Sequence, residues 1–228
     1  MEKGLNITYH YNDNMDLDII NPYVLKILIS CREEDSISAI SKRINLSYGW
    51  TYKWVQELAE TGVFNLTRMK VYLNKDNKFY KETIEYIKNT FKKSINFYYN
   101  TLSLFGIQYS FTNIDSVYVW TKGGYNIARY KDYYPIFIKI RLKDKSLFEE
   151  YCKKLELNIN KNKEVFYKVE YLDNFDSDYC ENMPVDSLKG TIKFMEKNKY
   201  NFEPALEMVN ELYNKKLKTK YKEVVTNV

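Results

Sequence analysis

The sequence predicts an α+β protein in two parts, and three observations lead to that prediction. Apolar residues recur at helical spacing three times between residues 22 and 61. A stretch rich in β-branched and aromatic residues follows, from Val63 to Asn74. The second half alternates such stretches with helical ones. Glycine and proline number only 7 and 4 among 228 residues, which argues against a collagen-like or disordered chain.

Signals for helix ends mark three short helices in the first part. Asn21 followed by Pro22 predicts the start of the first helix. Ser36 can cap the second helix and Ser47 the third, while Gly62 supplies the left-handed residue that ends the third. We expect these helices to share an inner apolar face made of Ile37, Ile40, Ile44, Leu46, Val55 and Leu58.

A long connector helix is expected between the two parts. An apolar stripe of Ile84, Ile87, Phe91 and Ile95 predicts a helix from about Phe79 to Phe97. We therefore expect three segments: a first domain at residues 1–76, a connector helix at 77–97 and a mixed α/β domain at 98–228. The polar residues 1–20 predict a loose arm or an edge strand, and the basic end of the chain predicts a frayed tail.

The last domain mixes predicted strands and helices. IFIKI (136–140) and VFYKVEY (165–171) predict strands, and KSLFEEYCKKLEL predicts a helix between them. Two more helices are expected, one starting near Asp186 or Ser187 and one after Phe202, with Pro204 in its first turn. The side chains expected to be buried in these helices are Leu147, Phe148, Tyr151, Leu155, Leu157, Leu206, Val209, Leu212 and Tyr213.

Composition and charge restrict the compartment and the partners. The net charge of +5 permits a nucleic-acid partner without demanding one. The first thirty residues lack a basic start and a continuous apolar core, and the run from Tyr23 to Ile29 is too short to cross a bilayer. Cys31, Cys152 and Cys180 are odd in number and far apart, which favours free thiols in a reducing compartment. We therefore expect a cytoplasmic protein without membrane contact.

Residues 36–75 resemble the helix-turn-helix and wing of DNA-binding proteins. The run SISAISKRINLSYGWTYKWVQELAETGVF is similar to winged-helix regulators of the MarR and ArsR kind. Those regulators show a small residue in helix two, a turn before a Ser/Tyr-rich recognition helix, and a Leu-x-x-x-Gly ending. Ala39, Ser47, Leu58 and Gly62 occupy these positions here. The resemblance implies an N-terminal winged helix-turn-helix whose third helix enters the major groove of double-stranded DNA.

The outer face of the third helix supplies candidate DNA contacts. Gln56 can pair with adenine, and Lys53 can reach guanine or phosphate. Backbone amides at the starts of the second and third helices can bind phosphate oxygens. The short wing, NLTRMK, departs from the family pattern because it offers only two basic residues. The residues expected to bind DNA are Ser36, Ser47, Tyr48, Trp50, Tyr52, Lys53, Gln56, Arg68 and Lys70.

Basic residues outnumber acidic ones in this segment. Between Ser36 and Lys75 there are six Lys or Arg and two Glu, a net charge of +4, so binding should weaken steeply with salt. The aromatic residues Trp50, Tyr52 and Trp54 leave open that this face packs on a protein partner instead, although we expect Trp54 in the core. Because specific DNA binding usually needs two half-sites, we expect a homodimer, with the connector helix as its contact.

The second half carries a different resemblance. YSFTNIDSVYVWTKGGYNIARYKDYYPIFIKI predicts a helix, a Gly-Gly turn and a strand. Together with MPVDSLKGTIKFMEKNKYNFEPALEMVNELY, it resembles the C-terminal domain of AbiE-type antitoxins over roughly residues 100 to 215. That resemblance implies a regulator of its own toxin–antitoxin-like operon, whose C-terminal domain contacts a nucleotidyltransferase-type toxin.

No pattern in the chain predicts catalysis. Gly123-Gly124 is not followed by the paired carboxylates of a two-metal site, and the acidic run at 173–181 lacks calcium-loop spacing. His10 is the sole histidine, so a Ser-His-Asp relay or a histidine-rich metal site cannot be built. We expect no enzyme, metal or cofactor. The leading hypothesis is a DNA-binding repressor. The alternatives are an antitoxin that occludes its toxin without specific DNA binding, and an enzyme whose winged helix recruits nucleic acid.

Overall fold

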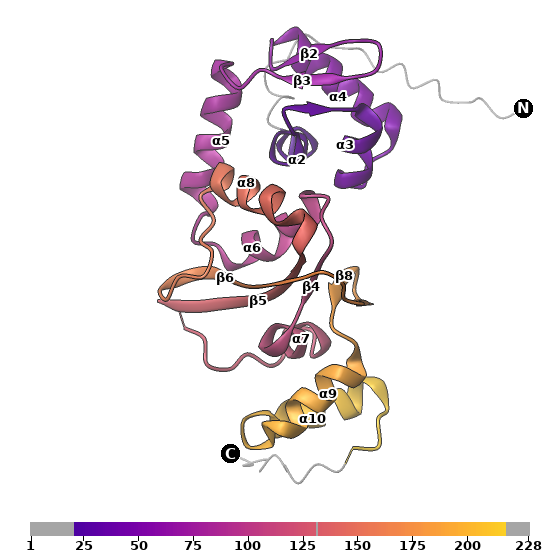
Figure 1. The fold of residues 1–228 in the computed structure, drawn as a ribbon, viewed down its shortest axis with the longest axis vertical. Helices are drawn as coiled ribbons and strands as arrows, with labels where there is room; N and C mark the ends of the chain where they lie inside the picture. Colours follow the sequence, from indigo (N-terminus) through magenta and orange to yellow (C-terminus); the bar gives the residue numbers. More distant parts are fainter. Residues whose placement is uncertain (1–20, 131, 218–228) are drawn as a thin grey trace, which may run out of the picture. The chain divides into compact units, whose positions relative to one another are not determined.

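The computed structural model describes residues 21–130 and 132–217, and the chain divides into two compact units, Met1–Thr83 and Ile84–Val228 (Figure 1). The predicted arm at residues 1–20, with His10, and the end of the basic tail lie outside the described residues. Each unit combines helices with a β-sheet, which confirms the α+β class. The division falls inside the segment that we expected to be the connector helix.

The described part of the first unit has helices and short strands in the order α2, β1, α3, α4, β2, β3. Their bounds are α2 Pro22–Ser30, β1 Glu34–Asp35, α3 Ile37–Ile44, α4 Tyr48–Glu60, β2 Phe64–Leu66 and β3 Val71–Leu73. The predicted helix ends are confirmed. The side chains of Asn21, Ser36 and Ser47 each accept a backbone N–H at the start of a helix. Gly62 follows α4 with a φ of +76°.

Most of the predicted inner face forms the core of the first unit. Four of its six residues are buried, namely Ile40, Ile44, Val55 and Leu58. Ile37 and Leu46 are only half-buried, because Ile37 lines a surface groove and Leu46 lies in the turn between α3 and α4. Trp54 is buried as predicted, with 4% of its surface exposed. Apolar residues of α2 complete the core: Val24, Ile27, Leu28 and Ile29.

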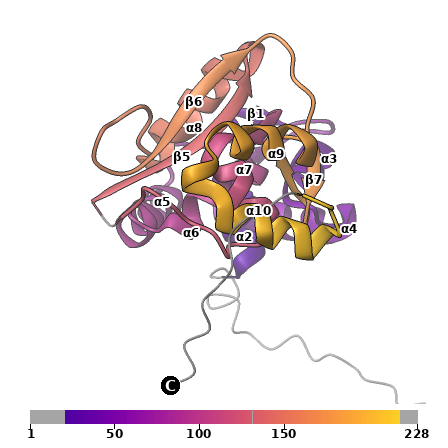
Figure 2. The ribbon, with the colours of Figure 1, turned by 90° about the horizontal axis from the view of Figure 1, so that it is seen from below.

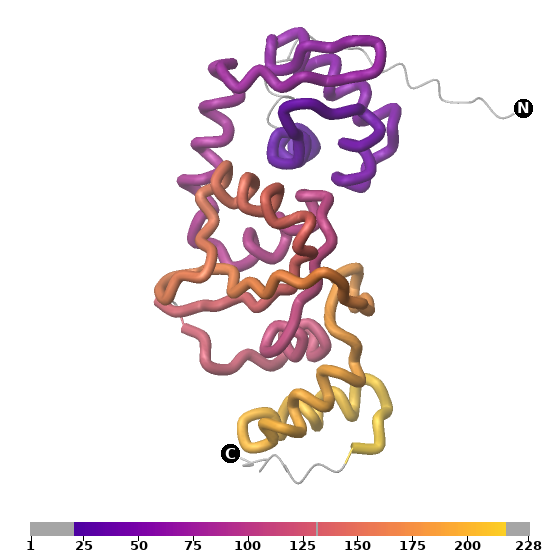
Figure 3. Tube along the Cα trace, in the orientation of Figure 1, coloured from indigo at the N-terminus to yellow at the C-terminus, as the bar shows by residue number. Residues whose placement is uncertain are grey.

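The three strands of the first unit form an antiparallel sheet in the order β1-β3-β2. Figure 3 shows β2 and β3 as a hairpin, and residues 67–70 form its loop. Strand β1 was not predicted, because two residues are too few to show the alternation of a strand. It pairs with β3 through Glu34 opposite Tyr72 and Asp35 opposite Val71. This pairing brings acidic residues beside the hairpin.

The predicted connector helix was wrong in length. The structure has two helices instead, α5 (Lys78–Phe91) and α6 (Ile95–Thr101). Ser94 caps α6 by accepting the N–H of Phe97 at 3.4 Å, and a capping serine favours a new helix start over continuation. Ile84 and Ile87 are buried within the chain itself. These two residues are therefore not available for the dimer contact expected on this stripe.

The second unit is built on a five-stranded mixed sheet in the order β6-β5-β4-β8-β7. The strands are β4 Tyr109–Phe111, β5 Tyr133–Arg141, β6 Glu164–Leu172, β7 Asp178–Cys180 and β8 Met183–Val185. The two predicted strands are confirmed as the inner parts of β5 and β6, which pair in parallel over nine residues each. Strands β4, β7 and β8 were missed because three residues give too short a pattern.

Helices cover both faces of this sheet. Figure 1 shows α6 and α8 (Lys145–Leu155) on one face and α7 (Asn113–Trp120) on the other. Two further helices, α9 (Leu188–Lys197) and α10 (Lys199–Tyr213), lie side by side, and α9 packs against α7 (Figure 2). Ser187 caps α9 as predicted. The helix predicted after Phe202 starts earlier, at Lys199, so Pro204 lies inside it rather than in the first turn.

The expected burial in these helices is confirmed at six of nine positions. Phe148, Tyr151, Leu155, Leu157, Leu206 and Val209 are buried. Leu147 and Tyr213 are half-buried, and Leu212 was placed wrongly because 46% of its surface is exposed. All three cysteines are free and buried, as expected for thiols without a disulfide framework. Over residues 21–130 and 132–217, none of the helices has the length and apolar character needed to cross a membrane.

Candidate nucleic-acid interface

A groove of about 380 Å³ lies in the first unit between the start of α3, one side of α4 and the β2–β3 hairpin. Six of the nine residues that we expected to bind DNA line it: Ser36, Tyr48, Tyr52, Gln56, Arg68 and Lys70. The other lining residues were not among the predicted DNA contacts; they are Ile37, Ser38, Leu66, Thr67, Met69 and Val71. The groove brings together side chains from three consecutive parts of the first unit: the start of α3, one side of α4 and the β2–β3 hairpin.

One side of α4 faces this groove with aromatic and amide side chains. Tyr48, Tyr52 and Gln56 follow one another at a spacing of four residues, so they lie on the same side of the helix. The rings of Tyr48 and Tyr52 stack with their centroids 6.3 Å apart. Their exposed fractions are 56% and 46%, which is high for tyrosine in a small domain. This side of α4 therefore offers two ring faces and one amide to a ligand.

The remaining expected residues of α4 lie outside the groove. Trp50 is 55% exposed. The ammonium group of Lys53 lies 5.5 Å from the ring centroid of Trp50 and 4.8 Å from that of Trp54. It also lies 3.7 Å from a carboxylate oxygen of Glu57. To contact guanine or phosphate, Lys53 would have to leave an ion pair and two cation–π contacts.

The start of α4 leaves space for a close approach. Ser47 accepts the N–H of Trp50 at 3.4 Å, and Ser36 accepts that of Ala39 at 3.1 Å. Each capping hydroxyl thus accepts the N–H of one of the backbone amides predicted to bind phosphate, so the prediction is left to the other amides of the first turn. A side chain at Gly49 would meet nothing within 4 Å. The first turn of α4 is therefore open to an incoming backbone.

The net charge predicted for residues 36–75 overstates the charge that is available to DNA. An acidic triplet at residues 33–35, just before the counted segment, forms three ion pairs: Glu33 with Lys75, Glu34 with Lys70, and Asp35 with Arg43. The hydrogen bond with Glu34 raises the pKa of Lys70, so this ammonium group stays charged but is neutralised by its partner. Of the six basic residues, Lys42 and Arg68 form no ion pair with any residue in the described ranges.

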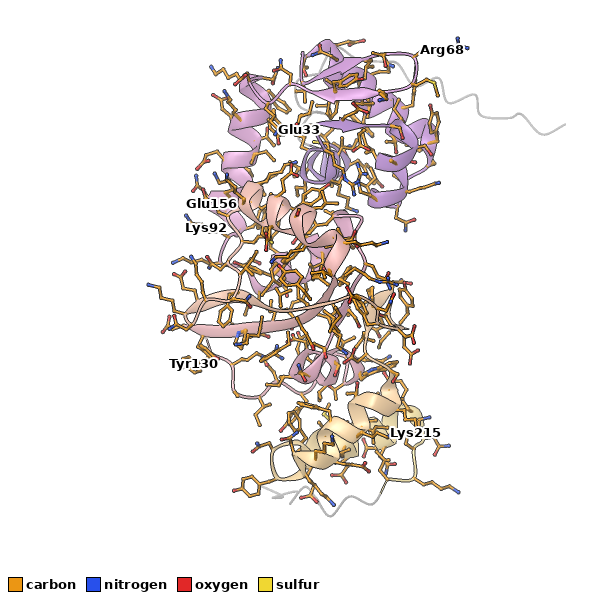
Figure 4. The ribbon with its side chains drawn as sticks, in the orientation of Figure 1. Glu33, Arg68, Lys92, Tyr130, Glu156 and Lys215 are labelled. Carbon is orange, nitrogen blue, oxygen red and sulfur yellow. The ribbon has the colours of Figure 1, made fainter. Side chains whose placement is uncertain are left out.

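The hairpin loop carries one cation and one apolar side chain at its tip. Thr67 closes the loop, because its N–H donates to the carbonyl of Lys70 at 2.9 Å and its hydroxyl accepts the N–H of Lys70 at 3.1 Å. Arg68 lies at this closed end and points away from the strands (Figure 4). Met69 beside it is 80% exposed. The hairpin loop is short, and its tip is held by its own hydrogen bonds.

The second unit contains a buried charged cluster that the sequence analysis missed. The side chains of Asp115 in α7 and Arg129 in the following loop are both 0% exposed. One carboxylate oxygen of Asp115 accepts from Arg129 at 2.7 Å and from the hydroxyl of Tyr99, and the other accepts the N–H of Phe137 at 2.6 Å. The guanidinium also lies 4.7 Å from the ring centroid of Tyr134.

This cluster connects elements rather than facing a cavity. Complete burial raises the pKa of Asp115, and the positive charge of Arg129 opposes that shift. Three donors satisfy the carboxylate, and they come from α6, from the loop after α7 and from β5. The arrangement therefore fixes the loop around residue 129 against the sheet, which is a structural role.

Comparisons of the chain with protein-family models, curated proteins and solved structures find no match. The resemblances to MarR and ArsR regulators and to AbiE-type antitoxins therefore stay predictions that rest on the residues quoted above. Within the part of the chain that the structure describes, no group of three or more His, Cys, Asp or Glu side chains could hold a metal ion.

Proposed function

We propose that the first unit is a winged helix-turn-helix domain that binds double-stranded DNA, and that the protein is a transcriptional repressor able to regulate its own operon. The order of elements supports this proposal, since two helices joined by the three-residue turn at 45–47 are followed directly by a β-hairpin. The observation that carries it is the groove of about 380 Å³, where most of the residues expected to bind DNA line one surface.

In the proposed complex, α4 enters the major groove with its Tyr48–Gln56 side. Gln56 hydrogen-bonds to adenine, and the two tyrosine rings contact sugars and thymine methyl groups. Arg68 at the hairpin tip binds phosphate. Because two basic residues of this segment are uncompensated, the slope of log K against log salt should be about −2, rather than about −5 for six phosphate contacts.

Selection of duplexes from a random pool, followed by fluorescence anisotropy, tests this proposal. The double variant Gln56→Ala/Arg68→Ala should bind the selected duplex at least roughly tenfold more weakly, because each lost contact contributes about 1–3 kcal/mol. Lys78→Ala is the matched control, since its ammonium group is exposed on α5 and outside the groove. Equal affinity of the wild type and the double variant would contradict the proposed binding surface.

A second candidate function follows from the aromatic character of the same surface. Tyr48, Trp50, Tyr52 and Met69 are exposed together with few uncompensated charges, and aromatic residues and Met are enriched at protein interfaces. In this alternative the protein is an antitoxin that occludes a nucleotidyltransferase-type toxin. Co-expression with the product of the adjacent gene distinguishes the two. A stable complex that Trp50→Ala disrupts, without any duplex binding by the wild type, favours the antitoxin.

We also propose that the DNA-binding form is a homodimer, because a repressor of this architecture reads two half-sites. Light scattering during size-exclusion chromatography tests this directly. The free protein, with a chain of 27.5 kDa, should have twice that mass, and the complex should have the mass of two chains plus one duplex. A monomer that remains monomeric when the duplex is added would refute it.

A further inference from the structure

The second unit contains a cavity of about 760 Å³ that the DNA-binding proposal does not use. It lies beside the end of α8 and is bounded by the residues that follow α5 and by the loop at residues 156–164. Its volume falls within the range of about 300–1,000 Å³ for sites of small molecules. Figure 4 shows Lys92 and Glu156, both of which line the cavity, near one another.

The charges around this cavity do not balance. Its walls carry four lysines and three glutamates: Lys92, Lys93, Lys153, Lys161, Glu149, Glu156 and Glu164. Each glutamate already has a basic partner. The pairs are Glu164 with Lys93 at 3.3 Å, Glu156 with Lys88 at 2.7 Å, and Glu149 with Lys145 at 4.0 Å.

Three of the four lysines that line the cavity form no ion pair within the described residues. Lys92, Lys153 and Lys161 form no ion pair with any other residue of the described chain. They come from the segment after α5, from the last turn of α8 and from the loop that follows it. All three carry a positive charge, which a bound anion would neutralise.

The loop that forms one wall is held in a strained conformation. Glu156, Asn160 and Glu164 have φ values of 53°, 49° and 60°, a left-handed region that non-glycine residues seldom adopt. Hydrogen bonds hold the loop in place. The N–H of Asn160 donates to the carbonyl of Tyr167 at 2.8 Å, and its side-chain oxygen accepts the N–H of Val169 at 3.0 Å. Strained segments that their surroundings fix in this way concentrate at ligand-binding sites.

We propose that this cavity binds the polyphosphate group of a small anionic ligand, with Lys92, Lys153 and Lys161 as the ammonium donors. The three lysines that form no ion pair in the described chain match the charge of a di- or triphosphate better than that of a single carboxylate, and Lys92 would exchange its longer-range attraction to Glu85 for a contact with the ligand. Lysine binds phosphate as a point charge on a flexible stem, so three separate segments can converge on one such group. The volume exceeds that of inorganic phosphate and leaves room for an attached nucleoside. The proposal does not depend on DNA binding by the first unit.

Calorimetric titration of the full chain with inorganic tripolyphosphate and, separately, with adenosine triphosphate tests the proposal. The variant Lys92→Ala/Lys153→Ala/Lys161→Ala should bind the tighter probe roughly a thousandfold more weakly, since each of the three charge-assisted contacts contributes about tenfold. The matched control is Lys143→Ala/Lys168→Ala/Lys197→Ala, which removes the same charge from exposed sites outside the cavity. The control should bind both probes as the wild type does. The single variant Lys161→Glu, in an exposed loop, should weaken binding by more than about tenfold.

The two probes separate the sources of the ligand chemistry. Tighter binding of adenosine triphosphate supports a nucleotide, and equal binding supports recognition of the polyphosphate alone. Three results would overturn the proposal: no binding of either probe by the wild type, equal binding by the wild type and the cavity variant, or an equal loss in the control variant. Loss of duplex binding by the cavity variant, with tripolyphosphate binding unchanged, would assign these lysines to nucleic acid and also overturn it.

Discussion

Removing the carboxylate of Asp115 should destabilise the second unit strongly. Both side chains of the Asp115–Arg129 pair are 0% exposed, so Asp115→Ala leaves a buried guanidinium without its counter-charge. Breaking a buried ion pair in this way costs about 3–5 kcal/mol. Asp115→Asn should also destabilise, because an amide has one acceptor oxygen, so its NH2 group would face either the N–H of Phe137 or the guanidinium group of Arg129, both of which now donate to the carboxylate.

Urea unfolding, monitored by hydrogen exchange of peptides from β5, measures the loss of stability of the second unit alone. The double variant Asp115→Leu/Arg129→Met removes both charges and should be more stable than Asp115→Ala, because an ion pair replaced by apolar residues is often neutral. As a control, Glu149→Gln breaks the exposed pair with Lys145, whose side chains are each 47% exposed, and should cost less than about 1 kcal/mol. A loss below about 1 kcal/mol in Asp115→Ala, or strictly additive single variants, would refute the structural role assigned to this cluster.

Three further predictions concern other parts of the chain. Gly62→Ala should destabilise the first unit by about 1–2 kcal/mol, because Gly62 has a φ of +76°. Gly49→Ala in the first turn of α4 should not destabilise it, because a side chain there meets nothing within 4 Å. Urea unfolding of the first unit compares the two variants, and equal effects would count against the assigned helix end. Burial raises the pKa of Tyr98 from 10.0 to about 12. About 3 kcal/mol of folding stability, present below pH 10, should therefore be lost as the pH rises through 12. Tyrosinate absorbance and circular dichroism should change together, and ionisation of every tyrosine near pH 10 in the folded chain would contradict this prediction. Glu34→Gln releases Lys70 from its ion pair, so duplex affinity should rise and the slope of log K against log salt should become more negative by about 1. An unchanged slope in the anisotropy assay would show that Lys70 does not contact phosphate.

Local signals in the sequence predicted the helix ends of the first unit well. Ser36, Ser47 and Gly62 act on amides or turns within a few residues of themselves, so neighbouring residues suffice to interpret them. Ser94 carried the same signal, but the apolar stripe from Ile84 to Ile95 outweighed it, and the predicted connector helix was therefore too long.

Contacts between distant residues could not be predicted in this way. Glu34 pairs with Lys70 across 36 positions, so a charge count over residues 36–75 missed the partner that neutralises this lysine. The pairing depends on strand β1, whose two residues show no periodicity. Asp115 and Arg129 are likewise single residues without a motif, and only the fold brings them together. The side of α4 that faces the groove was predictable, because helical spacing alone places Tyr48, Tyr52 and Gln56 together.

The most direct test of DNA binding through α4 is amide hydrogen exchange of the full chain with and without a selected duplex at low salt. We expect protection in peptides that cover Ser47–Gln56 and the hairpin loop at residues 67–70, because these segments line the proposed interface. The loop at residues 156–164 in the second unit should exchange as it does in the free protein. Protection confined to the second unit, or a bound duplex that leaves α4 and the hairpin loop unprotected, would contradict the proposed function.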